Sequence, residues 1–88
     1  MIVEFNKKFD KDISKLDKKL IIRIFEKITE IKKSSDLKNI LWIRKMVWYE
    51  IFYRVRVWNY RIWLKIKDSK VILERFKHRK DIYDYFPK

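Results

Sequence analysis

The chain has 88 residues and a formal net charge of +12, with 24 lysines and arginines against 12 aspartates and glutamates. That length fits one domain spanning residues 1–88, and the 17% aromatic content supplies enough large side chains for a core. The absence of cysteine excludes disulfides and thiolate chemistry, and a single histidine makes a metal site unpromising. The charge indicates a polyanionic partner, which could be a nucleic acid, an anionic membrane surface or an acidic protein.

The sequence gives no indication of a membrane or export role. No segment approaches the roughly 18 apolar residues of a transmembrane helix. Asn6, Lys7 and Lys8 come too early for the apolar core of a signal peptide. We therefore expect a cytoplasmic protein that has no membrane partner and needs no metal or cofactor.

The first half of the chain predicts one strand and two helices. Residues 2–5 form a short apolar strand, and Asn6 can cap a first helix. Ser14 and Asp17 have the spacing of a capping box, which predicts a second helix over about 17–33. The apolar face of this helix carries Leu20, Ile21, Ile24, Phe25, Ile28 and Ile31. Its other face carries Lys18, Lys19, Arg23, Lys27 and Lys32, which we interpret as facing solvent or a polyanionic partner.

The second half changes to the two-residue period of strands. Residues 49–57 and 60–67 alternate apolar with polar or charged side chains, and Trp58-Asn59 between them is a two-residue hairpin turn. Trp42 and Trp48, which flank the basic pair Arg44-Lys45 before the hairpin, are interpreted as core or partner contacts.

A second turn, a further strand and a tail complete the chain. Asp68-Ser69 is the turn, 71–76 the strand, and 79–86 a short helix that ends at Pro87. The predicted order is therefore β-α-α-β-β-β-α. This order predicts an α+β fold in which two N-terminal helices pack on a small antiparallel sheet.

A two-residue turn fixes the register of the hairpin. Arg56 then lies opposite Arg61, and Arg54 lies opposite Trp63, with the valines and isoleucines on the other side against the helices. Like charges placed directly opposite are destabilising, so an anion held between the arginines would relieve them, and replacing Arg61 should not harm the fold. Trp63 offers a ring on which a base could stack. The alternative is a solvated basic face without a ligand, and a register slip of one residue would move the whole set to the other face.

Two motifs resemble the RelE/ParE superfamily of toxins. Residues 53–62 resemble its hairpin pattern, with Trp58-Asn59 where the family usually has Gly-Asp, and residues 78–83 resemble the tail motif of many RelE-like toxins. Tryptophan tolerates a left-handed conformation poorly, so this turn puts the register in question. The resemblance implies a toxin of a type II toxin–antitoxin pair, held inactive by a cognate acidic antitoxin protein.

The superfamily resemblance leaves two activities open. RelE-like members cleave mRNA, typically in the ribosomal decoding site and without a metal, whereas ParE-like members poison DNA gyrase. The basic tail motif favours an endoribonuclease with mRNA and the ribosome as partners. The alternatives are a gyrase-targeting toxin and a non-catalytic nucleic-acid-binding module.

The resemblance also suggests which residues do the chemistry. Arg61 and Arg79 would stabilise the phosphate with Arg56 beside them. His78 would transfer protons, as histidines commonly do in catalysis, and Tyr83 would orient the nucleophile or stack on a base. In a tail helix, the i, i+4 spacing would put Arg79 and Tyr83 on one face. The predicted RNA-binding residues are Arg54, Trp63, Lys77 and Lys80. The competing interpretations are packing roles for the histidine and tyrosine, and solvated lysines.

Overall fold

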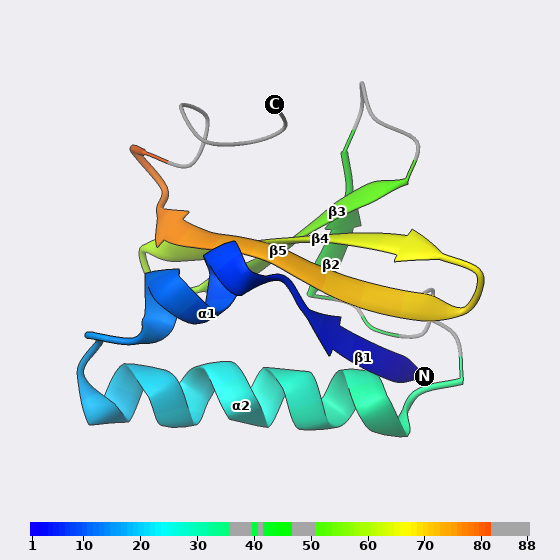
Figure 1. The fold of residues 1–88 in the computed structure, drawn as a ribbon, viewed down its shortest axis with the longest axis horizontal. Coiled ribbons are helices and arrows are strands. Elements are labelled where there is room, and N and C mark those ends of the chain that lie inside the picture. Colours follow the sequence, from blue (N-terminus) through cyan, green and yellow to red (C-terminus); the bar gives the residue numbers. More distant parts are fainter. Residues whose placement is uncertain (36–39, 41, 47–50, 82–88) are drawn as a thin grey trace.

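A computed structural model describes residues 1–35, 40, 42–46 and 51–81. Two helices and five strands lie within these ranges, which confirms the α+β class (Figure 1). In chain order they are β1 (Ile2–Phe5), α1 (Lys7–Ile13), α2 (Lys18–Lys33), β2 (Ile43–Lys45), β3 (Phe52–Val57), β4 (Tyr60–Lys67) and β5 (Lys70–His78). No helix in these ranges is long and apolar enough to cross a membrane.

The five strands form one sheet in the order β1-β5-β4-β3-β2. The pairs from β2 to β5 are antiparallel, but β1 runs parallel to β5, with Ile2 opposite Lys70 and Phe5 opposite Leu73. The prediction of a wholly antiparallel sheet was therefore wrong at this edge. A parallel neighbour needs a long connection, and the helices and the meander of β2 to β5 together supply it.

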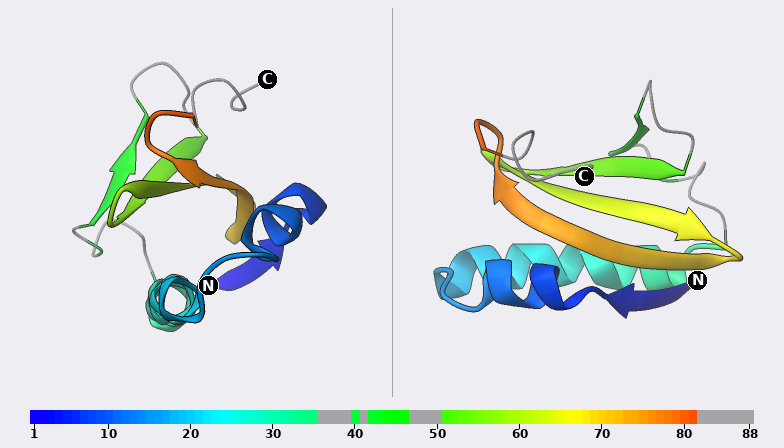
Figure 2. Two further views of the ribbon diagram at one scale, coloured as in Figure 1. Left: turned by 90° about the vertical axis from the view of Figure 1, so that its left-hand side faces the viewer. Right: turned by 45° about the horizontal axis from the view of Figure 1, so that its top comes forward.

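The helices cover one face of the sheet (Figure 2). Leu20, Ile24, Ile28 and Ile31 of α2 are buried in the same core cluster as Phe9 of α1. The predicted capping box was wrong in its details, because each residue serves a different helix. Asp17 is the N-cap of α2 and accepts the Lys19 amide at 2.8 Å, while Ser14 ends α1 and donates its hydroxyl to the Lys11 carbonyl at 2.8 Å.

The β3–β4 hairpin has the predicted register. Arg56 lies opposite Arg61, Arg54 opposite Trp63, and Val57 opposite Tyr60 across a two-residue turn. Trp58 takes the left-handed φ of 53° despite its bulk. Two contacts support this conformation: the Arg23 guanidinium lies 5.8 Å from the centroid of the Trp58 ring, and Arg61 Nη1 donates to the Trp58 carbonyl at 3.2 Å.

The strands differ from the prediction at both ends of the meander. The three-residue strand β2 was not predicted, and β5 runs over 70–78 instead of 71–76. The predicted first hairpin strand began at 49, but 47–50 lie outside the described residues and β3 begins at Phe52. Residues 79–81 form a turn, and the rest of the predicted tail helix lies outside the described residues.

A bulge in β5 reshapes the edge beside α1. Trp63 pairs with Arg75 while its neighbour Leu64 pairs with Leu73, so Glu74 is an extra residue on β5. Beyond this point α1 replaces β1 alongside β5. Asp12 of α1 accepts the Phe76 backbone amide at 3.0 Å, which satisfies an edge N–H that no strand pairs.

Candidate nucleic-acid interface

The face of the sheet turned away from the helices is basic. The strand register places its side chains in two rows that run across the strands. The first row contains Arg44, Arg54, Trp63 and Arg75, and the second contains Arg56, Arg61 and Lys77. Arg44 lies directly opposite Arg54, just as Arg56 lies opposite Arg61. Two like-charge pairs therefore adjoin on three neighbouring strands.

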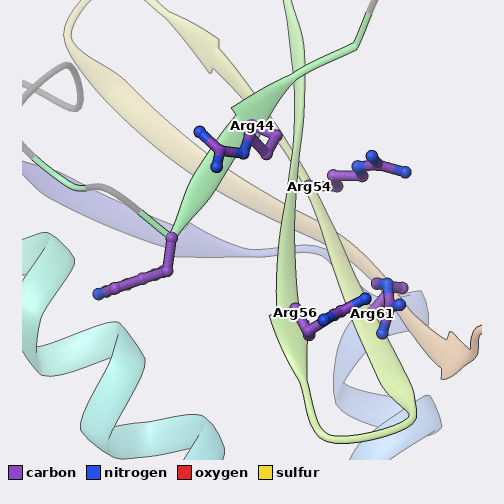
Figure 3. Close-up of a pocket in the computed structure, with 5 residues that line it drawn as sticks. Arg44, Arg54, Arg56 and Arg61 are labelled. Carbon is purple, nitrogen blue, oxygen red and sulfur yellow. The ribbon is translucent and has the colours of Figure 1, made fainter.

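These arginines surround a pocket of about 410 Å³, which we call the arginine pocket. Its lining residues come from β2, β3, β4 and the residue before β2: Trp42, Arg44, Arg54, Arg56 and Arg61. Figure 3 shows Arg56 extending across the hairpin toward Arg61, with Arg44 and Arg54 further along the strands. The four guanidinium groups thus come from fixed positions on paired strands.

The electrostatics of the arginine pocket favour an anion. Guanidinium groups remain protonated in proteins, so like charges directly opposite destabilise the sheet. Arg61 Nη1 donates to the carbonyls of Tyr60 at 2.8 Å and Trp58 at 3.2 Å, which fixes that guanidinium against the turn. Among the residues that the structure describes, no carboxylate forms an ion pair with Arg44 or Arg56. The pocket can therefore offer a phosphate several N–H donors.

Arg44 is a pocket residue that sequence reasoning did not assign to the site. It lies on β2, which has only three residues and so shows no alternation long enough to predict a strand. The available signal was its neighbourhood, because Arg44-Lys45 is a basic pair shortly before the hairpin.

His78 lies away from the arginine pocket. It is opposite Tyr60 in the β4–β5 register, and the two rings are 5.4 Å apart in an edge-to-face arrangement. Tyr60 in turn stacks on the buried ring of Phe76 at 5.1 Å, on the helix-covered side of the sheet. The His78 Nδ1 accepts the Lys80 backbone amide at 3.2 Å. The position of His78 therefore favours a packing role over a proton-transfer role beside Arg61.

Trp63 is not a stacking platform in this structure. Its side chain is on the basic face, as predicted, but its relative exposure is 0%. Met46 and Phe52 pack against it as a small second apolar cluster. The ring therefore has no exposed face for a base, and the expectation that Trp63 binds RNA by stacking was wrong.

The remaining predicted residues lie at the end of β5. Lys77 forms an ion pair with Asp12 at 3.2 Å, and Arg79 and Lys80 are exposed in the turn that follows. The Arg79 amide donates to the Asn59 carbonyl at 2.8 Å, so this turn lies against the hairpin tip. Tyr83 and Trp48 lie outside the described residues.

Comparison with known proteins identifies the family. No protein-family model matches the sequence. Toxin RelE3 of Methanocaldococcus jannaschii is 41% identical over 88 residues, which cover 99% of this chain and 100% of that protein. The chain belongs to the RelE family of toxins. Solved structures of RelE toxins also match the fold of this chain.

Two solved RelE structures match nearly the whole fold. The crystal structure of the RelB–RelE antitoxin–toxin complex from Methanococcus jannaschii matches with a TM-score of 0.80 and 39% identity, covering 96% of this chain and 99% of that chain. The archaeal RelE–RelB complex from Pyrococcus horikoshii matches with a TM-score of 0.73 at 20% identity, covering 89% and 93% of the two chains. At that identity the second likeness supports the fold alone.

Proposed function

We propose that this RelE-family toxin is an endoribonuclease that cleaves mRNA on the ribosome without a catalytic metal ion. The observation that carries the proposal is the arginine pocket, in which four guanidinium groups from three strands surround one cavity. Within the described residues, no three histidine, cysteine, aspartate or glutamate side chains gather as a metal site would require. The resemblance of residues 78–83 to the tail motif of RelE-like toxins favours the same activity.

The proposed reaction is an attack by the ribose 2′-oxygen on the adjacent phosphorus. The 2′-hydroxyl loses its proton, the 5′-oxygen leaves with a proton, and the products are a 2′,3′-cyclic phosphate and a 5′-hydroxyl. Negative charge develops on the non-bridging oxygens in between. Arg56 and Arg61 would donate to these oxygens, because a planar guanidinium matches a phosphate in two-point contacts.

The arginine pocket supplies orientation and charge stabilisation rather than proton transfer. Arginine is a poor proton donor and acceptor at neutral pH. His78 packs on the other side of the sheet, so the proposal does not use it for this step. On the strength of the tail motif, Tyr83 would orient the 2′-hydroxyl or stack on a nucleobase. Arg79, beside the hairpin tip, would be a further phosphate contact.

We also propose that an acidic antitoxin neutralises the toxin by covering the basic face. A relative of this chain has been crystallised in a RelB–RelE antitoxin–toxin complex, and the charge of +12 favours an acidic partner. Association of such a complex should weaken as salt rises, because exposed charge pairs are screened. An affinity that stays constant from low to high salt would argue against an electrostatic complex.

Translation of a defined mRNA on purified ribosomes tests the activity. The antitoxin-free protein is added, cut sites are mapped by primer extension, and the new ends are identified. We expect 2′,3′-cyclic phosphate ends, and no cut where the scissile nucleotide carries a 2′-deoxyribose. A 3′-hydroxyl end would contradict attack by the 2′-oxygen. Inhibition of gyrase supercoiling without any mRNA cut would favour the gyrase-targeting alternative instead.

A further inference from the structure

A second basic cavity lies between α1 and the C-terminal half of β5. It has a volume of about 530 Å³, and we call it the lysine groove. Its cations are Lys8, Lys11, Lys15, Arg75 and Lys77. The three lysines of the α1 segment are exposed, whereas Arg75 and Lys77 are partly buried. The groove adds a cluster of positive charge that the arginine pocket does not include.

The cations of the lysine groove fall into two sets: Arg75 and Lys77, which pair with Asp12, and three lysines that do not. The nearly buried Asp12 carboxylate, 5% exposed, accepts Arg75 Nε at 2.9 Å and Nη2 at 3.1 Å, and it pairs with Lys77 at 3.2 Å. It is the only carboxylate among the described lining residues, so five cations face one anion.

Lys8, Lys11 and Lys15 form the other set. Within the described ranges, no carboxylate forms an ion pair with them. Lys8 and Lys11 are spaced i, i+3 on α1, where like charges repel slightly. The fold therefore gains nothing from placing these three lysines around one cavity.

The lysine groove adjoins the arginine pocket across β4 and β5. Lys77 lies directly opposite Arg61, and Arg75 lies opposite Trp63. A polyanion that fills the arginine pocket and continues past Arg61 therefore meets Lys77 at the edge of the groove. The two cavities are consecutive along one possible path over the sheet and its α1 edge.

The chemistry of the lining distinguishes the possible partners. The described lining of the lysine groove has charged side chains and one serine, without an aromatic or aliphatic anchor. Protein interfaces usually have an apolar core with aromatic or arginine anchors. A nucleic-acid backbone presents a row of phosphates, which lysine can contact as a point charge on a flexible stem. The lining therefore fits a chain of phosphates better than an acidic protein segment.

We propose that the lysine groove binds the phosphodiester backbone of RNA outside the cleaved nucleotide, and so docks the toxin on its target. The inference rests on the proposed function for its choice of RNA. Two sources share this chemistry: ribosomal RNA, and the segment of mRNA that flanks the cut.

A triple substitution tests the groove directly. Lys8→Gln, Lys11→Gln and Lys15→Gln together remove three exposed charges and should leave the melting temperature nearly unchanged. The matched control is Lys33→Gln, Lys45→Gln and Lys67→Gln, which removes the same charge from exposed positions that line neither cavity. Binding is measured for purified ribosomes by co-sedimentation and for a fluorescent single-stranded RNA by anisotropy, over a range of salt.

The groove variant should bind roughly tenfold or more weakly, with a log–log salt slope that is shallower by about 2, because three phosphate contacts are lost. The control should stay within about threefold on the scale of surface substitutions, and arginines at positions 8, 11 and 15 should restore binding. Loss for ribosomes alone identifies ribosomal RNA as the source, and equal loss for the free strand identifies flanking mRNA.

Two results would overturn the groove assignment. One is ribosome and RNA binding equal to that of the control, and the other is a loss of affinity confined to an acidic antitoxin. Failure of the proposed function gives a different result. The unsubstituted protein would then bind RNA through the groove but leave the mRNA uncut.

Discussion

The arginine pocket and the lysine groove are both basic, but they differ in how the fold holds their charges. The arginine pocket draws four guanidinium groups from paired strands, and Arg61 is fixed by hydrogen bonds to two turn carbonyls. The lysine groove draws exposed lysines from a seven-residue helix and the residues just after it. The arginines are therefore positioned by strand pairing and by hydrogen bonds, whereas the three lysines of the groove are exposed side chains on and just after a short helix.

This difference indicates that net charge alone does not define a catalytic surface. Stabilising a transition state requires donors that are already oriented when the charge develops. Holding a backbone requires only charge at the right distance, since each contact is an ion pair that salt can replace. We therefore expect changes in the arginine pocket to affect the rate, and changes in the lysine groove to affect affinity.

The largest effect should come from Arg61→Ala. Loss of one oriented donor from such a site costs about 10²–10³ in rate, or roughly 3–4 kcal/mol. Arg61→Lys keeps the charge without the fork and should recover only part of the loss. The measurement is single-turnover cleavage on ribosomes. A rate within about threefold of the unsubstituted protein, under 1 kcal/mol, would remove Arg61 from the chemistry.

The structure revises what Arg61→Ala should do to stability. Relief of the Arg56 pair alone predicts an unchanged or higher melting temperature. The hydrogen bonds from Arg61 to the Trp58 and Tyr60 carbonyls oppose that gain. Their loss should cost about 1 kcal/mol of the free energy of unfolding, which is too little to unfold the domain.

Asp12→Ala should cost the most stability, because Asp12 anchors the lysine groove. The substitution removes a carboxylate that pairs with the partly buried Arg75 and Lys77 and accepts a hydrogen bond from the Phe76 amide. Breaking a pair of this kind costs about 3 kcal/mol of the free energy of unfolding. Urea unfolding measures the loss, and the exposed Asp10→Ala on the same helix is the control, expected within about 0.5 kcal/mol. Equal stability of the two variants would show that α1 is held by its apolar contacts alone.

Arg44→Ala tests whether the residue that sequence reasoning missed belongs to the arginine pocket. An exposed charged hydrogen bond to phosphate is worth about 1.5 kcal/mol, so cleavage should slow roughly tenfold. Lys45→Ala, the next residue on the same strand, is the matched control and should leave the rate nearly unchanged. If both variants cleave equally fast, the pocket ends at Arg54.

The smallest effect should come from Ser69→Gly, which separates stability from both functions. Asp68 and Ser69 have positive φ values of 51° and 63°, as a type I′ turn requires, and glycine adopts this conformation without strain. The free energy of unfolding should rise by about 0.5–1 kcal/mol in a chemical denaturation experiment. Cleavage and RNA binding should be unaffected, because the turn lines neither cavity. A change in either would couple function to overall stability.

Local patterns predicted the hairpin, whereas non-local pairings escaped prediction. The alternation of residues 52–57 and 60–67 fixed which side chains share a face, and the two-residue turn fixed the register, even with Trp58 in a left-handed conformation. The parallel pairing of β1 with β5 and the extra residue Glu74 depend on contacts far apart in sequence. No periodicity in a single strand reveals them.

In the candidate site too, local patterns were predicted correctly and non-local contacts were not. Arg54, Arg56 and Arg61 line one pocket, and the predicted hairpin register already placed them on one face of the sheet. Trp63 faces the predicted side but is buried, because Met46 and Phe52 cover it from other parts of the chain. His78 belongs to β5 instead of the tail, so the strand alternation turns it toward Tyr60. The sequence therefore predicted the face of the sheet on which a side chain lies, but it did not predict which other residues pack over that side chain.

Saturation kinetics of mRNA cleavage on ribosomes most directly test the division between the two basic regions. Arg61→Ala should lower the saturating rate and leave the half-saturating ribosome concentration nearly unchanged. The triple substitution of Lys8, Lys11 and Lys15 by glutamine should raise that concentration and leave the saturating rate nearly unchanged. If both variants change the same parameter, the arginine pocket and the lysine groove act as one undivided basic surface, and the account is contradicted.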